Sequence, residues 1–154
     1  MPRNNYNRRY RYSRRSSRPT DRVIQAATSS VPAATTAAVY TFTADEPLTA
    51  TNFQLDIGTY NITQGVPYAL VHVPDGYQAN VLNYPTVAPQ NLYEPVQNVL
   101  ISGVITNNSQ GIQDHRRSRY SRKLREGDRI ALLVYNPLTE AVPVSFELNF
   151  TTVH

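Results

Sequence analysis

The sequence predicts an all-β protein: an eight-stranded antiparallel jelly-roll sandwich preceded by a disordered basic N-terminal arm. The composition is the first observation, because the 154 residues are 40% hydrophobic but rich in Thr, Val, Tyr, Asn and Pro, which favour strands and turns over helices. The second is a succession of short apolar or alternating runs separated by turn residues and partly long connections. The third is an N-terminus almost without aliphatic side chains, which leaves about 120 residues for one core.

The first element, residues 1–22, carries eight arginines against Asp21 alone, a net charge of +7. It cannot bury enough apolar surface to offset the entropy of ordering, so the free arm is expected to be disordered. Guanidinium groups form bidentate hydrogen bonds with phosphate oxygens, and the tyrosines between them can stack on unpaired bases without sequence specificity. The arm is therefore predicted to bind single-stranded nucleic acid. An import signal or a solubilising tail is the alternative, and one arm can serve both roles. The predicted nucleic-acid-binding residues of the arm are Arg3, Arg8, Arg9, Arg11, Arg14, Arg15, Arg18 and Arg22, with Tyr6, Tyr10 and Tyr12.

The next segment, residues 23–36, is predicted to be a linker. Thr20 and Asp21 can cap a short helix over residues 22–27, which would be marginal without a surface to pack on. The small residues of 28–36 then suit a flexible tether.

The body, residues 37–154, reads as strand, turn, strand. In the first run we expect Ala38, Tyr40 and Phe42 to face inward, whereas 99–106 is apolar enough for a central strand covered on both sides. Residues 83–96, with three prolines, predict a long surface excursion. Alternation in the second and last runs places 53, 55 and 57, and 144, 146, 148 and 150, on single faces. The strand-like runs are 37–43, 53–57, 68–73, a weaker one at 78–82, 99–106, 117–125, 130–135 and 142–152.

A second basic segment, residues 116–129, holds seven basic residues against two acidic ones, a net +5, while the remainder outside the arm has no Lys or Arg and eight acidic residues. In a strand, Arg116, Tyr120, Arg122 and Leu124 share one face. The other face becomes a basic row spaced by about 6.6 Å, close to the separation of phosphates along an extended strand. The alternative is an edge strand that charge protects from aggregation. The row consists of Arg117, Arg119, Lys123 and Arg125.

Enzyme chemistry has little support in this sequence. There is no cysteine, and the three histidines, His72, His115 and His154, lack metal-ligand spacing. There is no phosphate-binding glycine loop, nucleophile elbow or zinc-protease motif. We expect no catalytic activity, no metal and no cofactor, with His72 a packed or interface residue. No run reaches the roughly 20 apolar residues of a membrane span, and no signal-peptide segment is evident, which favours the cytosol or nucleus and no membrane partner.

The stretch from Arg122 to Leu132, RKLREGDRIAL, resembles the basic strand, Gly-Asp turn and apolar strand of single jelly-roll coat proteins. The resemblance is strongest to those of small circular Rep-encoding single-stranded DNA viruses, the circovirus-like family; satellite RNA virus coat proteins are also similar, and the turn occurs in cellular jelly rolls of the tumour-necrosis-factor and complement type. The arm and the strand-like runs extend the architectural match over the whole chain.

The resemblance implies a capsid protein whose shell domain, 37–154, forms a closed homo-oligomer of about 60 copies. The arm would point inward and bind the single-stranded genome, DNA in preference to RNA. The strand 117–125 would lie in the sheet nearer the lumen, and 74–96 outside or at subunit contacts. The resemblance also implies a host nuclear import receptor as partner, and location in the virion and the host nucleus.

Two other classes remain open. One is a cellular basic nucleic-acid-binding β-sandwich protein with a basic tail. The other is a trimeric jelly-roll ligand or lectin, which the arginine arm and the lack of a signal-peptide segment oppose.

Overall fold

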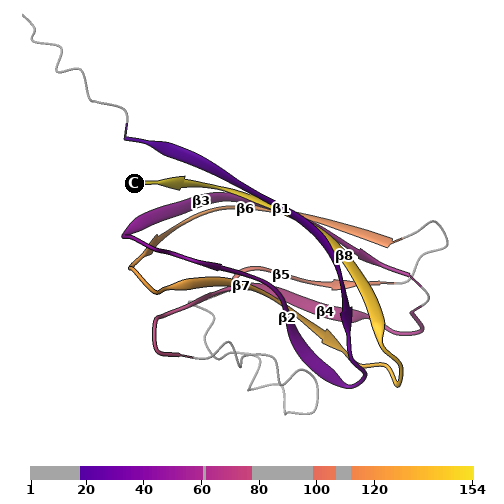
Figure 1. Cartoon of the computed structure of the whole chain (residues 1–154). Helices are drawn as coiled ribbons and strands as arrows, with labels where there is room; N and C mark the ends of the chain where they lie inside the picture. Colours follow the sequence, from indigo (N-terminus) through magenta and orange to yellow (C-terminus); the bar gives the residue numbers. More distant parts are fainter. Residues whose placement is uncertain (1–17, 61, 78–98, 107–111) are drawn as a thin grey trace, which may run out of the picture.

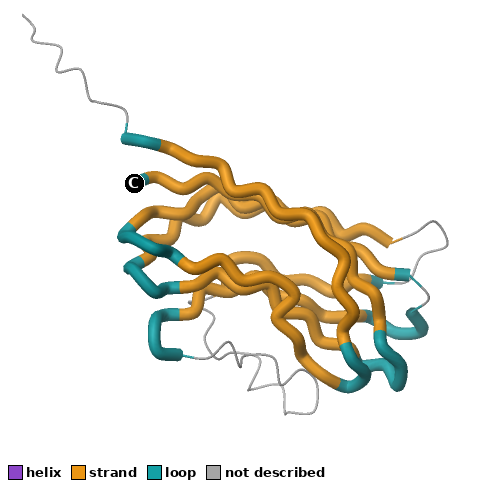
Figure 2. Tube along the Cα trace, in the orientation of Figure 1, coloured by secondary structure: helices purple, strands orange, loops and turns teal. Residues whose placement is uncertain are grey.

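The computed structural model describes residues 18–60, 62–77, 99–106 and 112–154. Within these residues it contains eight strands in two four-stranded antiparallel sheets, stacked face to face (Figures 1 and 2). One sheet has the order β1-β8-β3-β6 and the other β2-β7-β4-β5, so the chain crosses repeatedly between layers. This is a jelly roll, and the predicted fold class is confirmed. The strands are β1 (Thr20–Val31), β2 (Thr35–Thr43), β3 (Leu48–Thr59), β4 (Val66–Val73), β5 (Val99–Ile105), β6 (Ile112–Leu124), β7 (Arg129–Asn136) and β8 (Val142–Val153).

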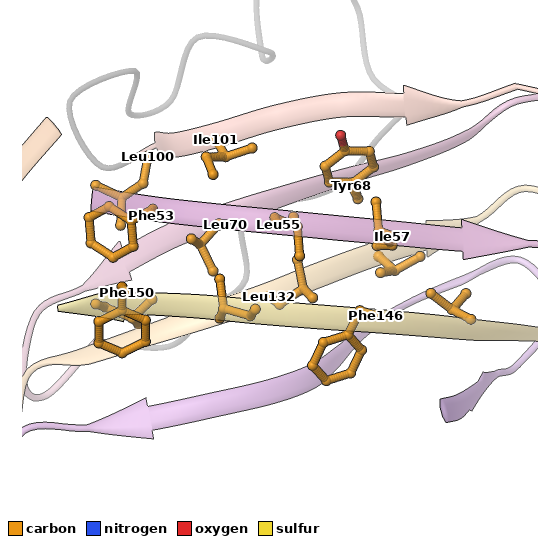
Figure 3. Packing of buried hydrophobic residues seen from close by; sticks show 14 of the residues in the cluster. Phe53, Leu55, Ile57, Tyr68, Leu70, Leu100, Ile101, Leu132, Phe146 and Phe150 are labelled. Carbon is orange, nitrogen blue, oxygen red and sulfur yellow. The ribbon is translucent and has the colours of Figure 1, made fainter. Parts of the chain in front are cut away.

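The core fills the space between the two sheets (Figure 3). Phe53, Leu55 and Ile57 of β3 point into it, as their alternation predicts, and so do the even-numbered residues of β8. Phe150 packs against Phe53 with ring centroids 5.4 Å apart and meets Phe42 edge-on at 5.2 Å. Each such side chain contributes about 1.5–3 kcal/mol by leaving water, so this layer holds the sheets together.

The segment before the body differs most from expectation. Residues 22–27 are not a helix, and much of the expected linker 23–36 is strand, because β1 pairs with β8 over its whole length, from Thr20 opposite Val153 to Val31 opposite Val142. In the strand, the backbone of residues 20–31 forms hydrogen bonds with the edge of β8, whereas a short helix over residues 22–27 would leave most of its backbone groups without intrahelical partners. The sandwich therefore begins at Thr20, ahead of the predicted boundary at 37, and Arg22 belongs to a sheet.

Two smaller expectations were also wrong. Ala38 is exposed, because a register shift between Ala38 and Tyr40 changes the phase of β2 and turns Ala37 toward the core with Tyr40 and Phe42. The apolar strand β5 lies at the edge of its sheet, and Val104 is exposed; the strands buried along both faces are β4 and β7. The expected strand at 78–82 and the excursion at 83–96 lie outside the described residues.

The Gly-Asp turn between β6 and β7 joins several elements. Gly127 has a φ of +85°, which L side chains rarely adopt. Its N–H donates to the carbonyl of Ala44 (2.8 Å), whose own N–H donates to the carbonyl of Asp128 (2.9 Å). The Asp128 carboxylate accepts from the backbone N–H groups of Asp75 and Arg125, both at 3.0 Å. One turn thus ties the β2–β3 and β4 ends of the sandwich to β6.

A histidine extends this network into the sandwich. His72 of β4 is 7% exposed; its Nε2 lies 3.1 Å from Asp128 Oδ2, and its Nδ1 accepts a hydrogen bond from Arg122 Nε at 2.9 Å. Because Nδ1 accepts, Nε2 carries the proton and donates to Asp128. His72 is thus a packed residue, as expected. Burial alone would raise the pKa of Asp128, but the hydrogen bonds from Arg125, Asp75 and His72 outweigh it and lower that pKa.

We expect Asp128→Asn to destabilise the fold at pH 7 by about 1–3 kcal/mol, because charge-assisted hydrogen bonds to buried donors are weakened. A lowered pKa in the folded state means that the carboxylate stabilises the fold above the unfolded value of about 3.9 and that this contribution disappears as the pH falls through the lowered pKa. Urea unfolding between pH 7 and pH 2 should therefore show a shallower acid loss in Asp128→Asn than in the unsubstituted protein. The exposed Asp45→Asn is the matched control and should retain the parent profile; equal acid slopes in all three would contradict the assignment.

We expect Gly127→Ala to cost more stability than Gly76→Ala. Both glycines have positive φ, so both variants bear a backbone penalty of about 1–2 kcal/mol. A Cβ at Gly127 would also lie 2.7 Å from Asp75 Cγ, whereas one at Gly76 meets nothing within 4 Å. Thermal unfolding of the two variants measures the loss of stability in each. Because Gly76→Ala bears only the backbone strain, the difference between the two losses is the cost of the contact with Asp75. Equal losses would show that Asp75 moves aside without a loss of stability.

Candidate nucleic-acid interface

The outer face of the sheet β1-β8-β3-β6 is polar and carries basic residues from each of the two segments, Arg22 from the first and Arg117, Arg119 and Lys123 from the second. Along β8 the even-numbered residues are buried, and Asn149 and Thr151 point to the other side with Gln54 of β3. The register places Asn149 opposite Gln54, and Gln54 opposite Arg117 of β6. We call this outward row, Asn149, Gln54 and Arg117, the amide row.

A shallow hollow of about 440 Å³ lies on this face. Arg22 comes from β1, at the end of the predicted arm, whereas Arg117 and Arg119 come from the second basic segment. Two basic tracts that are separate in the sequence therefore meet at one place. The lining residues are Arg22, Asn52, Phe53, Gln54, Arg117, Ser118, Arg119, Asn149 and Thr151.

The predicted basic row is only partly regular. Thr51 pairs with Ser121 but Phe53 pairs with Ser118, so two β6 residues, Arg119 and Tyr120, stand against the single Asn52 of β3. Asn52 adopts a φ of +56°, which asparagine tolerates. This bulge carries Arg119 into the hollow but breaks the even spacing expected for a phosphate ladder.

The remaining members of the row lie elsewhere. Lys123 is exposed and pairs in register with Thr49. Arg125 follows the end of β6, where its backbone N–H donates a hydrogen bond to the Asp128 carboxylate. Arg18 is exposed just before β1. Neither Lys123 nor Arg125 lines the hollow. The predicted residues Arg3, Arg8, Arg9, Arg11, Arg14 and Arg15, with Tyr6, Tyr10 and Tyr12, lie outside the described residues.

The opposite set of β6 has structural partners. Leu124 is buried, Arg122 binds His72, and Arg116 Nε donates to Asp114 Oδ2 at 3.1 Å. Tyr120, in the bulge, is instead 68% exposed. The same Asp114 oxygen accepts from Tyr68 Oη at 2.6 Å; burial first, and then this hydrogen bond, raise the pKa of Tyr68. On one face of β6, Arg116 and Arg122 bind other residues of the fold; on the other face, Arg117 and Arg119 line the hollow.

The hollow has a defined electrostatic border. Among the residues that the structure describes, none that lines it is acidic. In the next outward row, Asp56 pairs in register with both Glu147 and His115, and His115 bonds to the Asp56 carboxylate. Arg117 Nε donates to His115 Nε2 at 3.0 Å, which orients the arginine from its own strand. An anion is thus favoured inside the hollow and repelled beyond it.

Sequence reasoning missed the amides Asn52, Gln54 and Asn149. A signal existed for two of them, since Gln54 and Asn149 alternate with core residues in strands whose phase was predicted correctly. Their proximity to Arg22 and Arg117 depends on strand order and register, which alternation does not reveal. Within the described ranges, no group of three or more His, Asp or Glu side chains is placed to hold a metal ion. None of the described residues belongs to a helix capable of spanning a bilayer.

The chain was compared with protein-family models, curated sequences and solved structures. No protein-family model and no curated protein sequence matches the chain. Among solved structures, it is similar to a chain of Bacillus endospore appendages, described as a novel family of disulfide-linked pili, with 12% identity and a TM-score of 0.45 over 90% of this chain and 93% of that one. It is also similar to a chain in the structure of infectious bursal disease virus, Gx strain, with 11% identity and a TM-score of 0.46 over 90% of this chain; it spans 33% of that longer chain.

We expect replacement of Arg117 and Arg119 by glutamine to weaken binding to single-stranded oligonucleotides and to reduce the slope of log K against log[salt] by about 1 per lost phosphate contact. Arg116→Gln removes the same charge from the same strand but from an arginine already paired with Asp114, so it should leave the slope nearly unchanged. Fluorescence anisotropy at several salt concentrations makes the measurement. Equal slopes for all variants would contradict the division of β6 into a binding and a structural face.

Proposed function

We propose that the protein is a viral coat protein that self-assembles into a small closed shell and packages a single-stranded genome. The observation that carries the proposal is the convergence of the two basic tracts: Arg22, which continues the arm, lies with Arg117 and Arg119 around one hollow on one sheet. A jelly roll with a cationic hollow on the outer face of one sheet suits a subunit that has an inside and an outside, and we assign this face to the lumen.

Charge is consistent with this role. About 60 copies in a closed symmetric shell would bring about 400 positive charges from residues 1–22 alone, and about 700 with the second basic segment. This suits a genome of roughly one or two thousand nucleotides, each with one phosphate charge. From the resemblance to circovirus-like coat proteins we favour a DNA genome over an RNA genome. The same resemblance suggests that a host nuclear import receptor recognises the arm, and that the protein is located in the virion and in the host nucleus. The proposal assigns no catalytic activity, metal or cofactor.

The second candidate is a cellular basic nucleic-acid-binding β-sandwich protein. The same basic face supports it, because a hollow lined by arginine and amide groups binds nucleic acid in a monomer as well as in a shell. Shell formation distinguishes the two candidates, because only the coat protein is expected to assemble into a closed shell.

We expect the purified, nuclease-treated full-length protein to form uniform particles of about 20 nm, the size expected for about 60 subunits of this length, containing protected nucleic acid. Electron microscopy and the ratio of absorbance at the nucleic-acid and protein maxima, taken on one fraction, make the test. A variant that lacks residues 2–17 keeps β1 whole and should lose most of the bound nucleic acid. A monodisperse monomer or trimer of the full-length protein would overturn the coat-protein proposal and favour the cellular one.

A further inference from the structure

We propose that the hollow is a base-contacting site for one unpaired nucleotide: the guanidinium groups of Arg117 and Arg119 hold its phosphate, and the amides of Gln54 and Asn149 contact the edge of its base. This inference rests on the proposed nucleic-acid binding and adds to it. A basic row alone would bind any backbone equally.

The lining combines two kinds of chemistry. Phosphate oxygens only accept hydrogen bonds, so arginines alone satisfy them. The hollow contains, in addition, the three amides Asn52, Gln54 and Asn149, each of which offers both a donor and an acceptor. The edges of nucleobases carry the same mixture of donors and acceptors, and a carboxamide pairs with N6 and N7 of adenine in a bidentate manner. The ligand that matches the whole lining is therefore a nucleotide.

The amide row gives this ligand a defined orientation. Gln54 is the register partner of Asn149 on one side and of Arg117 on the other, so the three side chains leave the sheet in one line. Adjacent strands lie about 4.8 Å apart, which puts the backbones of Arg117 and Asn149 about 10 Å apart. One end of the row is cationic and the other is amide, which matches a ligand that is anionic at one end and polar at the other.

The amide end is held by the surrounding structure. Asn149 is only 7% exposed, and Arg22 Nη2 donates to its Oδ1 at 3.5 Å, a long contact that a ligand can replace. Arg117 is positioned by His115, and Asn52 by the bulge. A volume of about 440 Å³ is within the usual size of small-ligand sites. Asp56 and Glu147 in the next row close the site to further phosphates.

The test compares two probes with equal phosphate number: a ten-residue oligo-dA and a ten-residue abasic oligonucleotide. Full-length protein freed of nucleic acid is measured by fluorescence anisotropy as the parent, as Gln54→Met, which keeps the length of the side chain but removes its hydrogen bonds, and as Gln64→Ala. Gln64 is an exposed amide outside the hollow and serves as the matched control. Stacking by the arm affects every variant alike, so the readout is the ratio of the two affinities.

We expect Gln54→Met to lower the ratio of oligo-dA to abasic affinity by about fivefold to tenfold, with abasic binding retained and Gln64→Ala unchanged. An unchanged ratio, or an equal loss for both probes, would overturn the base contact while leaving the proposed coat function intact. Failure of the parent protein to bind either probe would instead overturn the proposed function.

A second measurement needs no variant. Photo-crosslinking of the parent protein to an oligonucleotide that carries 8-azidoadenine, followed by mass spectrometry, should place crosslinks in peptides containing residues 52–54 or 149–151. Crosslinks confined to residues 1–17 would overturn the inference.

Discussion

The carboxylate of Asp128 is the constraint on which the cationic face depends. It accepts hydrogen bonds from the backbone of Asp75 and Arg125 and from His72, and His72 in turn receives Arg122. These contacts fix the end of β6 against β4 of the opposite sheet. Because side chains alternate along a strand, fixing one residue of β6 toward the core fixes its neighbours toward solvent. The buried Asp128 carboxylate thus helps to fix Ser121 and Lys123, the neighbours of Arg122, toward solvent.

The bulge opposite Asn52 adds what alternation cannot provide. A regular strand would present basic groups at equal intervals, a surface with no preferred position for a ligand. The one additional residue of β6 at the bulge places Arg117 and Arg119 beside Gln54 and Asn149. Bulges commonly re-aim side chains at functional sites, and here one converts a row into a hollow with a cationic side and an amide side.

Local patterns were sufficient for the parts of the fold whose signal is local. Phe53, Leu55 and Ile57 showed the core face of β3. The Gly-Asp turn was identified from the resemblance of residues 122–132 to jelly-roll coat proteins, and the positive φ of Gly127 explains why a glycine stands there. Residues 20–31 carried a weaker signal: most of them are polar or small, the apolar Val23 and Ile24 are adjacent instead of alternating, and the strand with which they pair is β8, residues 142–153. The hollow was unpredictable for the same reason, since it joins Arg22 to Asn149 across 127 positions. The arginines of the hollow could be predicted from the distribution of charge along the sequence, whereas the amides could be identified only from the strand register.

The pairing of β1 with β8 has a consequence for the order of folding. Contacts between residues far apart in sequence close the longest loops and form slowly. In a chain made from its N-terminus, β1 leaves the ribosome before the other seven described strands, and its partner β8 is the last of these eight to follow. Arg22 therefore reaches the hollow only when β8 is in place. A nascent chain that lacks β8 exposes Arg22 without Asn149 and Thr151 beside it, so the arginine and amide face is assembled only when β1 and β8 pair.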